Sequence, residues 1–193
     1  PDSARNYLYV AEIGDNEAVF PYKYIYRFEE PAIKKAHQQE TITITEFETI
    51  IFELPDGRKD TEALLVDPKT RNLIVVSKRE EPVNVYQIEY PYPINDTITA
   101  KQVATLPLTQ IVAGSFSSDG NEILMKNYNH IYYWKNSSNM SLLELLKEQP
   151  KEIPYSIEPQ GESITWAYDD SGFFTISEIN KGKNSFLYFY KRK

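Results

Sequence analysis

The amino-acid sequence predicts an all-β protein with the architecture of a β-propeller. Two observations support this fold class. A unit of about fifty residues recurs three times, and β-branched and aromatic residues dominate the segments between polar turns. The 193 residues are enough for one ordinary domain, so we assign residues 1–193 to a single β-propeller domain.

The repeat is clearest in the first two strands of each unit. The first strand of a unit is expected at 60–66, 110–116 and 160–166. The second strand is expected at 73–77, 123–125 and 173–176. A polar turn such as Ser118-Asp119-Gly120-Asn121 joins the two strands. The spacing therefore places Glu62, Val112 and Glu162 at equivalent positions.

Two further strands complete each unit. The third strands are expected at 83–88, 131–134 and 186–190, and the fourth strands at 48–54, 101–106 and 152–155. An upstream half-unit is formed by residues 7–11 and 23–28. The chain thus supplies fourteen strands, or about three and a half four-stranded blades. Natural propellers close with about 4–8 blades, so we expect missing N-terminal blades or a partner chain to complete the ring.

One short helix and one connection interrupt the strands. Ser141 can cap a helix over 142–148, and Pro150 ends it. Residues 29–40 form a charged connection that we expect to be partly helical. The alternative fold is an irregular β-sandwich in which the fifty-residue spacing is a coincidence.

Composition excludes several classes of function. The net charge of −7 argues against nucleic acid as a partner, because phosphate binding needs clustered positive charge. The chain has no cysteine, and its two histidines, His37 and His130, argue against a multi-histidine metal site. No apolar run approaches the ~20 residues that span a bilayer, so no membrane insertion is expected.

Several short motifs, in a fixed order, resemble those of a known family. They are Glu12-Ile13-Gly14-Asp15-Asn16, Tyr26-Arg27-Phe28-Glu29-Glu30-Pro31, Asp60-Thr61-Glu62-Ala63-Leu64, Ser77-Lys78-Arg79, Ser117-Ser118-Asp119-Gly120 and Pro159-Gln160-Gly161-Glu162. The chain resembles the phytase-like (esterase-like) β-propeller proteins, a largely uncharacterised bacterial family. It departs from the family pattern at Glu12, where the family has Asp, and it lacks the family's preceding Trp-Glu-Asp tract. The resemblance implies an extracytoplasmic propeller, either secreted or periplasmic.

The propeller geometry predicts where functional side chains gather. In an up-and-down blade, the inner strand begins and the second strand ends on the same rim. The candidate residues of this rim are Glu12, Asp15, Asn16, Asp60, Glu62, Lys78, Arg79, Gln160, Glu162 and Glu178. Since the inner strands line the channel, Glu62 and Glu162 should lie closest to it.

This rim has two interpretations that the sequence leaves open. Carboxylate and amide oxygens around a wet opening suit Ca²⁺ or Mg²⁺, with Glu62 and Glu162 as the candidate metal ligands. The same carboxylates can instead form a structural network with Lys78 and Arg79. Likewise, Asp15 and Asn16 form either a metal-binding turn or an ordinary tight turn.

We therefore expect a propeller whose acidic rim binds a small ligand together with a divalent cation. One alternative is a metal-dependent hydrolase acting as a phosphoesterase or lactonase on the same rim. The other is a scaffold without catalysis, which binds a protein ligand through its loops.

Overall fold

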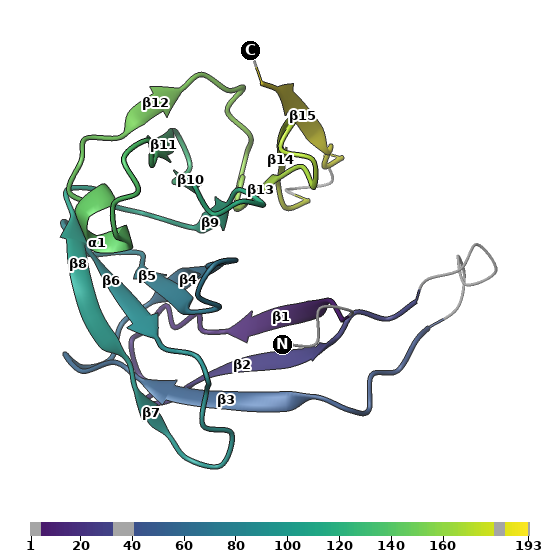
Figure 1. Ribbon diagram of the computed structural model, residues 1–193, viewed down its shortest axis with the longest axis vertical. Coiled ribbons are helices and arrows are strands. Elements are labelled where there is room, and N and C mark those ends of the chain that lie inside the picture. The colour runs from purple at the N-terminus through teal and green to yellow at the C-terminus, as the bar shows by residue number, and fades with distance from the viewer. Residues whose placement is uncertain (1–4, 33–40, 180–183, 193) are drawn as a thin grey trace.

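The strands of the protein stand in four small sheets around a common centre (Figure 1). The computed structural model describes residues 5–32, 41–179 and 184–192. The architecture is a four-bladed β-propeller, which confirms the fold class expected from the repeat.

Each blade is a small sheet whose strands follow one another from the centre outward. The first blade contains β1 (Tyr7–Glu12), β2 (Lys23–Glu29), β3 (Glu48–Glu53) and β7 (Ile98–Thr99). The second contains β4 (Thr61–Val66), β5 (Leu73–Ser77), β6 (Val83–Ile88) and β8 (Lys101–Leu106). The third contains β9 (Ala113–Phe116), β10 (Glu122–Lys126), β11 (Ile131–Lys135) and β12 (Lys151–Ile153). The fourth contains β13 (Ser163–Trp166), β14 (Gly172–Ile176) and β15 (Tyr188–Lys191).

All fourteen expected strands are present in the expected order. Their distribution explains the estimate of three and a half blades. Within the described residues, the first blade has no inner strand before β1, and the fourth has no outer strand after β15. The two-residue strand β7 was not expected, and it pairs in parallel with β3 at the outer edge of the first blade.

The single expected helix is present but shorter than predicted. Helix α1 (Leu142–Leu145) begins at a capping box in which Ser141 and Glu144 each bond the other's backbone N–H. In the described part of the chain no helix is long and apolar enough to cross a membrane. Of the connection expected at 29–40, Glu29 ends β2, whereas residues 33–40, including His37, lie outside the described residues.

Hydrophobic contact between neighbouring blades holds the ring together. Strand β5 is buried at every position. Its Leu73 and Val75 pack against the first blade, whereas Ile74 and Val76 pack against the third. This follows from the period of two in a strand, which sends successive side chains to opposite faces. A third core, which includes Leu124 of β10, joins the third and fourth blades.

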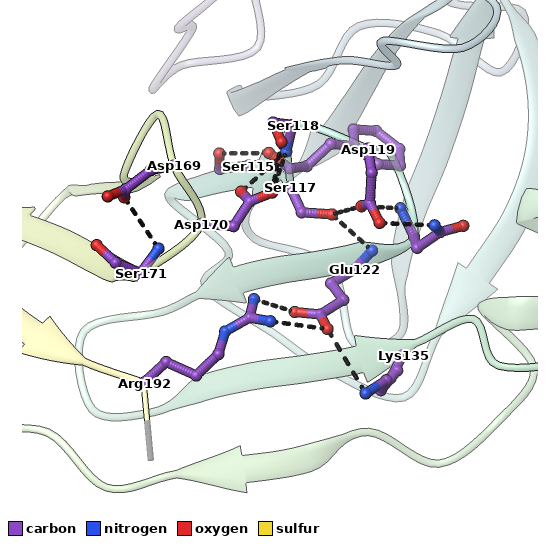
Figure 2. A network of polar contacts seen from close by, with 12 residues as sticks. Ser115, Ser117, Ser118, Asp119, Glu122, Lys135, Asp169, Asp170, Ser171 and Arg192 are labelled. Carbon is purple, nitrogen blue, oxygen red and sulfur yellow. Dashed lines mark hydrogen bonds and ion pairs between the residues drawn. The ribbon is translucent and has the colours of Figure 1, made fainter.

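Polar turns join the blades on the rim that carries the β9–β10 and β13–β14 hairpins (Figure 2). The backbone N–H of Ser118 donates to Asp170 Oδ1 over 3.0 Å, which links the third and fourth blades. The amine of Lys69, in the β4–β5 turn, donates to Asn121 Oδ1 over 2.5 Å. The predicted hairpin turn Ser118–Asn121 is confirmed on this rim, and its hydrogen bonds link neighbouring blades outside the core.

The inner strands approach one another closely at Gly114 of β9. A Cβ atom built on Gly114 would lie 2.9 Å from both Cδ atoms of Leu65 on β4. Leu65 is only 2% exposed and belongs to the core between the second and third blades, so it has little room to move. Glycine at this position therefore sets the distance between two strands that line the channel.

We predict that Gly114→Ala lowers the free energy of unfolding by about 1–3 kcal/mol, because the added methyl group overpacks the core. Urea unfolding followed by tryptophan fluorescence measures this change. The matched control is Gly14→Ala, since a Cβ at Gly14 meets no atom within 4 Å. The control should change stability by less than about 0.5 kcal/mol. Equal effects from the two substitutions would contradict the packing described for Gly114.

Candidate functional site

A polar pocket of about 420 Å³ opens on the rim where inner strands begin and second strands end. It is lined by Asn16, Glu62, Lys78, Arg79, Gln110, Tyr128, Gln160, Glu162 and Glu178. A second pocket of about 390 Å³ shares Glu62, Glu162 and Glu178 with the first. Its other wall residues include Ile13, Val112 and Ile176. All four blades thus contribute to two adjoining pockets at the centre of the ring, which share three glutamates.

Three positions of the fifty-residue repeat supply most of this lining. One position holds Glu62, Val112 and Glu162 at the start of the inner strands. A second holds Lys78, Tyr128 and Glu178 just beyond the second strands. The third contributes Gln110 and Gln160, just before the inner strands. Residues that are fifty positions apart in the sequence therefore lie around the same pockets in the structure.

The structure brings together seven of the ten rim residues expected from sequence: Asn16, Glu62, Lys78, Arg79, Gln160, Glu162 and Glu178. Asp15 and Asp60 lie buried beside the opening and serve the fold, as described below. Glu12 lies apart from this group and accepts a hydrogen bond of 2.7 Å from the Tyr26 hydroxyl. Gln110 and Tyr128 were missed. The repeat itself could have identified them, because they are equivalent to Gln160 and Lys78.

A chain of polar contacts crosses the pocket from the second blade to the fourth. The Lys78 amine donates to Glu62 Oε1 over 2.7 Å. It also lies 5.4 Å from the centroid of the Tyr128 ring. The Tyr128 hydroxyl in turn donates to Glu162 Oε1 over 2.5 Å. Three blades are thereby connected through side chains that line the pocket.

The charges of this chain shift the pKa values of its members. Burial raises the pKa of Glu62, and the Asp60 and Glu162 carboxylates raise it further, although Lys78 opposes the change. Burial alone would lower the pKa of Lys78, but its hydrogen-bonded partners raise it. Burial and the bond to Glu162 raise the pKa of Tyr128. The rim is therefore rich in negative charge even with Lys78 in place.

Asp15 and Asp60 form the structural part of the rim network. Asp15 is 4% exposed, and its carboxylate accepts hydrogen bonds of 2.9 Å from the backbone N–H groups of Val19 and Phe20. Burial would raise the pKa of Asp15, but these bonds and the charge of Lys23 lower it. The tight-turn interpretation of Asp15 and Asn16 thus accounts for the geometry of this loop.

Asp60 joins the first two blades. It is 2% exposed, accepts the backbone N–H of Asp15 over 2.8 Å and accepts Nε of Arg79 over 2.9 Å. Arg79 also donates to the Asn16 side chain. Asp60 therefore fixes the Arg79 guanidinium at the pocket edge and ties the loop after β1 to the second blade.

A fully buried cation lies behind Glu162. Lys126 of β10 is inaccessible to solvent, donates to the carbonyl oxygen of Gly161, and lies 5.2 Å from the centroid of the Tyr155 ring. Glu158 lies close by, and neither of its buried carboxylate oxygens has a hydrogen-bond partner among the described residues. Burial lowers the pKa of Lys126 to about 8, although Glu158 and Glu162 oppose the shift. Lys126 thus holds the backbone that presents Glu162.

The opening is lined by oxygen-bearing side chains of the type that bind a hard cation, but the number of carboxylates among them is small. Among residues 5–32, 41–179 and 184–192, no group of three or more His, Cys, Asp or Glu is placed to hold a metal ion. Glu62 and Glu162 would supply two carboxylates, and the amide oxygens of Gln110 and Gln160 could add neutral ligands from the same pocket. Ca²⁺ accepts such mixed oxygen sets completed by water.

Comparison with known proteins identifies no relative by sequence. No family model matches the chain, and no curated protein matches it. By structure, it is similar to a chain of the nidogen/laminin complex, with 10% identity and a TM-score of 0.51 over 95% of this chain and 60% of that one. It is also similar to hydrazine synthase of Kuenenia stuttgartiensis, with 10% identity and a TM-score of 0.50 over 95% of this chain and 55% of that one. At this identity the likeness shows the fold alone.

We predict that Asp60→Ala lowers the free energy of unfolding by about 2–3 kcal/mol, because a buried backbone N–H and a guanidinium lose their acceptor. Urea unfolding measures the loss. Asp96→Ala, at an exposed loop position, is the control and should be near neutral. A loss no larger than that of the control would show that the Asp60 contacts do not stabilise the ring.

We predict a distinctive pH profile for Lys126. In the folded protein its amine loses a proton near pH 8, whereas in the unfolded chain it does so near its ordinary pKa of 10.5. Between these values the unfolded state binds more protons, so stability rises with pH. The unfolding free energy of the wild type should rise relative to Lys126→Met from pH 8 to 10, by about 1 kcal/mol per pH unit. Parallel profiles would contradict the burial of a titrating amine.

Proposed function

We propose that this propeller binds a small polar ligand in the rim pocket, together with a divalent cation held by Glu62 and Glu162. One observation carries the proposal: all four blades place polar side chains around a single opening of about 420 Å³. A pocket with this lining favours a hydrophilic ligand, because hydrogen-bonding groups that lose water must find partners.

The charge balance supports a cationic component in the bound state. Lys78 is paired with Glu62, and Arg79 with Asp60. The carboxylates of Glu162 and Glu178 line the same pocket. Within the described residues neither of them forms an ion pair as Glu62 and Asp60 do, although the buried Lys126 lies behind Glu162. A bound Ca²⁺ or Mg²⁺ would neutralise this excess and could present further coordination positions to an oxygen-bearing ligand.

The hydrogen bonds of the two glutamates leave room for such a role. Glu62 and Glu162 are each held through Oε1, by Lys78 and Tyr128 respectively. Their positions are thus fixed before a ligand arrives, and Oε2 of each is the oxygen that we assign to the cation. Preorganisation of this kind lowers the cost of binding. The motif resemblance to phytase-like propellers and its implied extracytoplasmic location belong to the same proposal.

We predict that millimolar CaCl₂ raises the thermal unfolding midpoint of the wild-type protein. At a concentration of one hundred times Kd, a ligand of the folded state adds about 2.7 kcal/mol, which for a chain of this length is a shift of roughly 5–10 °C. Differential scanning calorimetry with CaCl₂ and with MgCl₂ measures the shift directly.

The decisive variant is Glu162→Gln, which removes the charge while its amide oxygen can still accept the Tyr128 hydroxyl. It should lose most of the calcium shift with little change in the metal-free midpoint. Glu89→Gln, at an exposed position beyond β6, is the matched control and should keep the full shift. A wild-type protein that shows no shift, or a Glu162→Gln variant that keeps it, would rule out the proposed cation site.

A further inference from the structure

The exposed apolar side chains of the described residues gather on the first and fourth blades. On the first blade, Leu8 and Val10 are 41% and 50% exposed. On the fourth, Ile176 and Phe189 are 40% and 47% exposed. The second and third blades, which have a neighbour on each side, bury both of their faces. Apolar side chains are therefore exposed on the two blades that have a neighbouring blade on one side only.

The outward face of the first blade has the composition of an inter-blade core. The alternate side chains of β1 and β2, such as Tyr9 and Ile25, pack toward the second blade. The other set points away from it, and the strand register places Leu8 beside Phe28 and Val10 beside Tyr26. Phe47 packs edge-on against the Tyr26 ring on the same face, with centroids 5.8 Å apart. These neighbouring side chains form a largely apolar sheet face, with Glu12 at its end, of the kind that marks an interaction site.

The fourth blade carries a matching face. Phe173 of β14 packs toward the third blade, so its neighbours Phe174 and Ile176 point the other way. The register places Phe174 beside Phe189 of β15, and the two rings lie 4.8 Å apart between centroids. The first and fourth blades therefore each expose one apolar sheet face, of the type that packs against a neighbouring blade elsewhere in the ring.

The strand edges next to these faces are open as well. In the second and third blades, β5 and β10 each pair with an inner strand. Their equivalent in the first blade, β1, pairs within the described residues with β2 alone. Likewise β6 and β11 each pair with an outer strand, whereas their equivalent in the fourth blade, β15, pairs with β14 alone in the part of the chain that the structure describes. Proteins rarely leave such edges unpaired next to an apolar face.

We propose that further propeller blades of the same polypeptide cover these two faces, with an inner strand pairing antiparallel to β1 and an outer strand to β15. An apolar face is best covered by another apolar sheet face. A further blade that is apolar on both sides, as the second and third blades are, would provide one. This chain aligns over 95% of its length with 60% and 55% of the two similar structures, so it spans only part of their length. An inner strand beside β1 would also add a side chain to the pocket next to Gly14, where space is open.

The absence of cysteine allows a direct test by thiol labelling. Val10→Cys and Ile176→Cys report on the two faces, and Tyr168→Cys reports on a site that is 98% exposed in the β13–β14 turn. Each variant is made in the longest natural reading frame that contains residues 1–193, and separately in the 193-residue chain. In the longer chain we expect Val10→Cys and Ile176→Cys to react with a maleimide about tenfold or more slowly than Tyr168→Cys.

Three results would overturn the proposal. The first is labelling of all three positions at similar rates in the longer chain, a comparison that needs no folded 193-residue chain. The second is a natural reading frame that adds no strand-forming residues. The third is protection already present in the 193-residue chain that disappears on dilution, with a doubled mass by light scattering, because that pattern would assign the faces to a second copy.

Discussion

The ring depends on hydrophobic contact between sheets that are apolar on both faces. The fully buried strand β5 illustrates it, since Leu73 and Val75 serve one neighbour and Ile74 and Val76 the other. Each core fixes one blade against the next, so the angle between blades follows from side-chain packing. Where a neighbour is lacking, as on the outer faces of the first and fourth blades, the same composition leaves apolar surface exposed.

Because the blades pack through apolar faces, many of the polar contacts between blades lie on the two rims of the ring. On one rim, turns lock through contacts such as that of Ser118 with Asp170. On the other, buried carboxylates such as Asp60 first satisfy backbone groups and then position Arg79 at the pocket. Carboxylates that serve the fold and carboxylates that face the opening thus lie side by side. The network with Lys78 and Arg79 is present, because Lys78 pairs with Glu62 and Arg79 with Asp60. Glu62 and Glu162 also line the opening, and their role toward a cation belongs to the proposed function.

The sequence determined the fold and most of the rim because both depend on periodicity. Strands 73–77, 83–88 and 101–106 match their predicted bounds, and seven of ten rim residues line the pocket. The errors arise where local rules are insufficient. Tyr128, in the loop between β10 and β11, was not among the expected rim residues, because its reach to Glu162 depends on the neighbouring blade. Lys126 was missed because nothing local shows that a lysine in a strand will be buried.

The claim that different blades present interacting side chains to one opening is tested most directly by a double-mutant cycle. Tyr128→Phe, Glu162→Ala and the double variant are compared by urea unfolding of the metal-free protein. Alanine leaves the Tyr128 hydroxyl without its acceptor, whereas glutamine could still accept this hydrogen bond. The structure places these residues 34 positions apart in sequence but in a 2.5 Å hydrogen bond, so we predict a coupling energy of about 1–2 kcal/mol. Effects that add to within about 0.3 kcal/mol would mean that the two side chains do not meet.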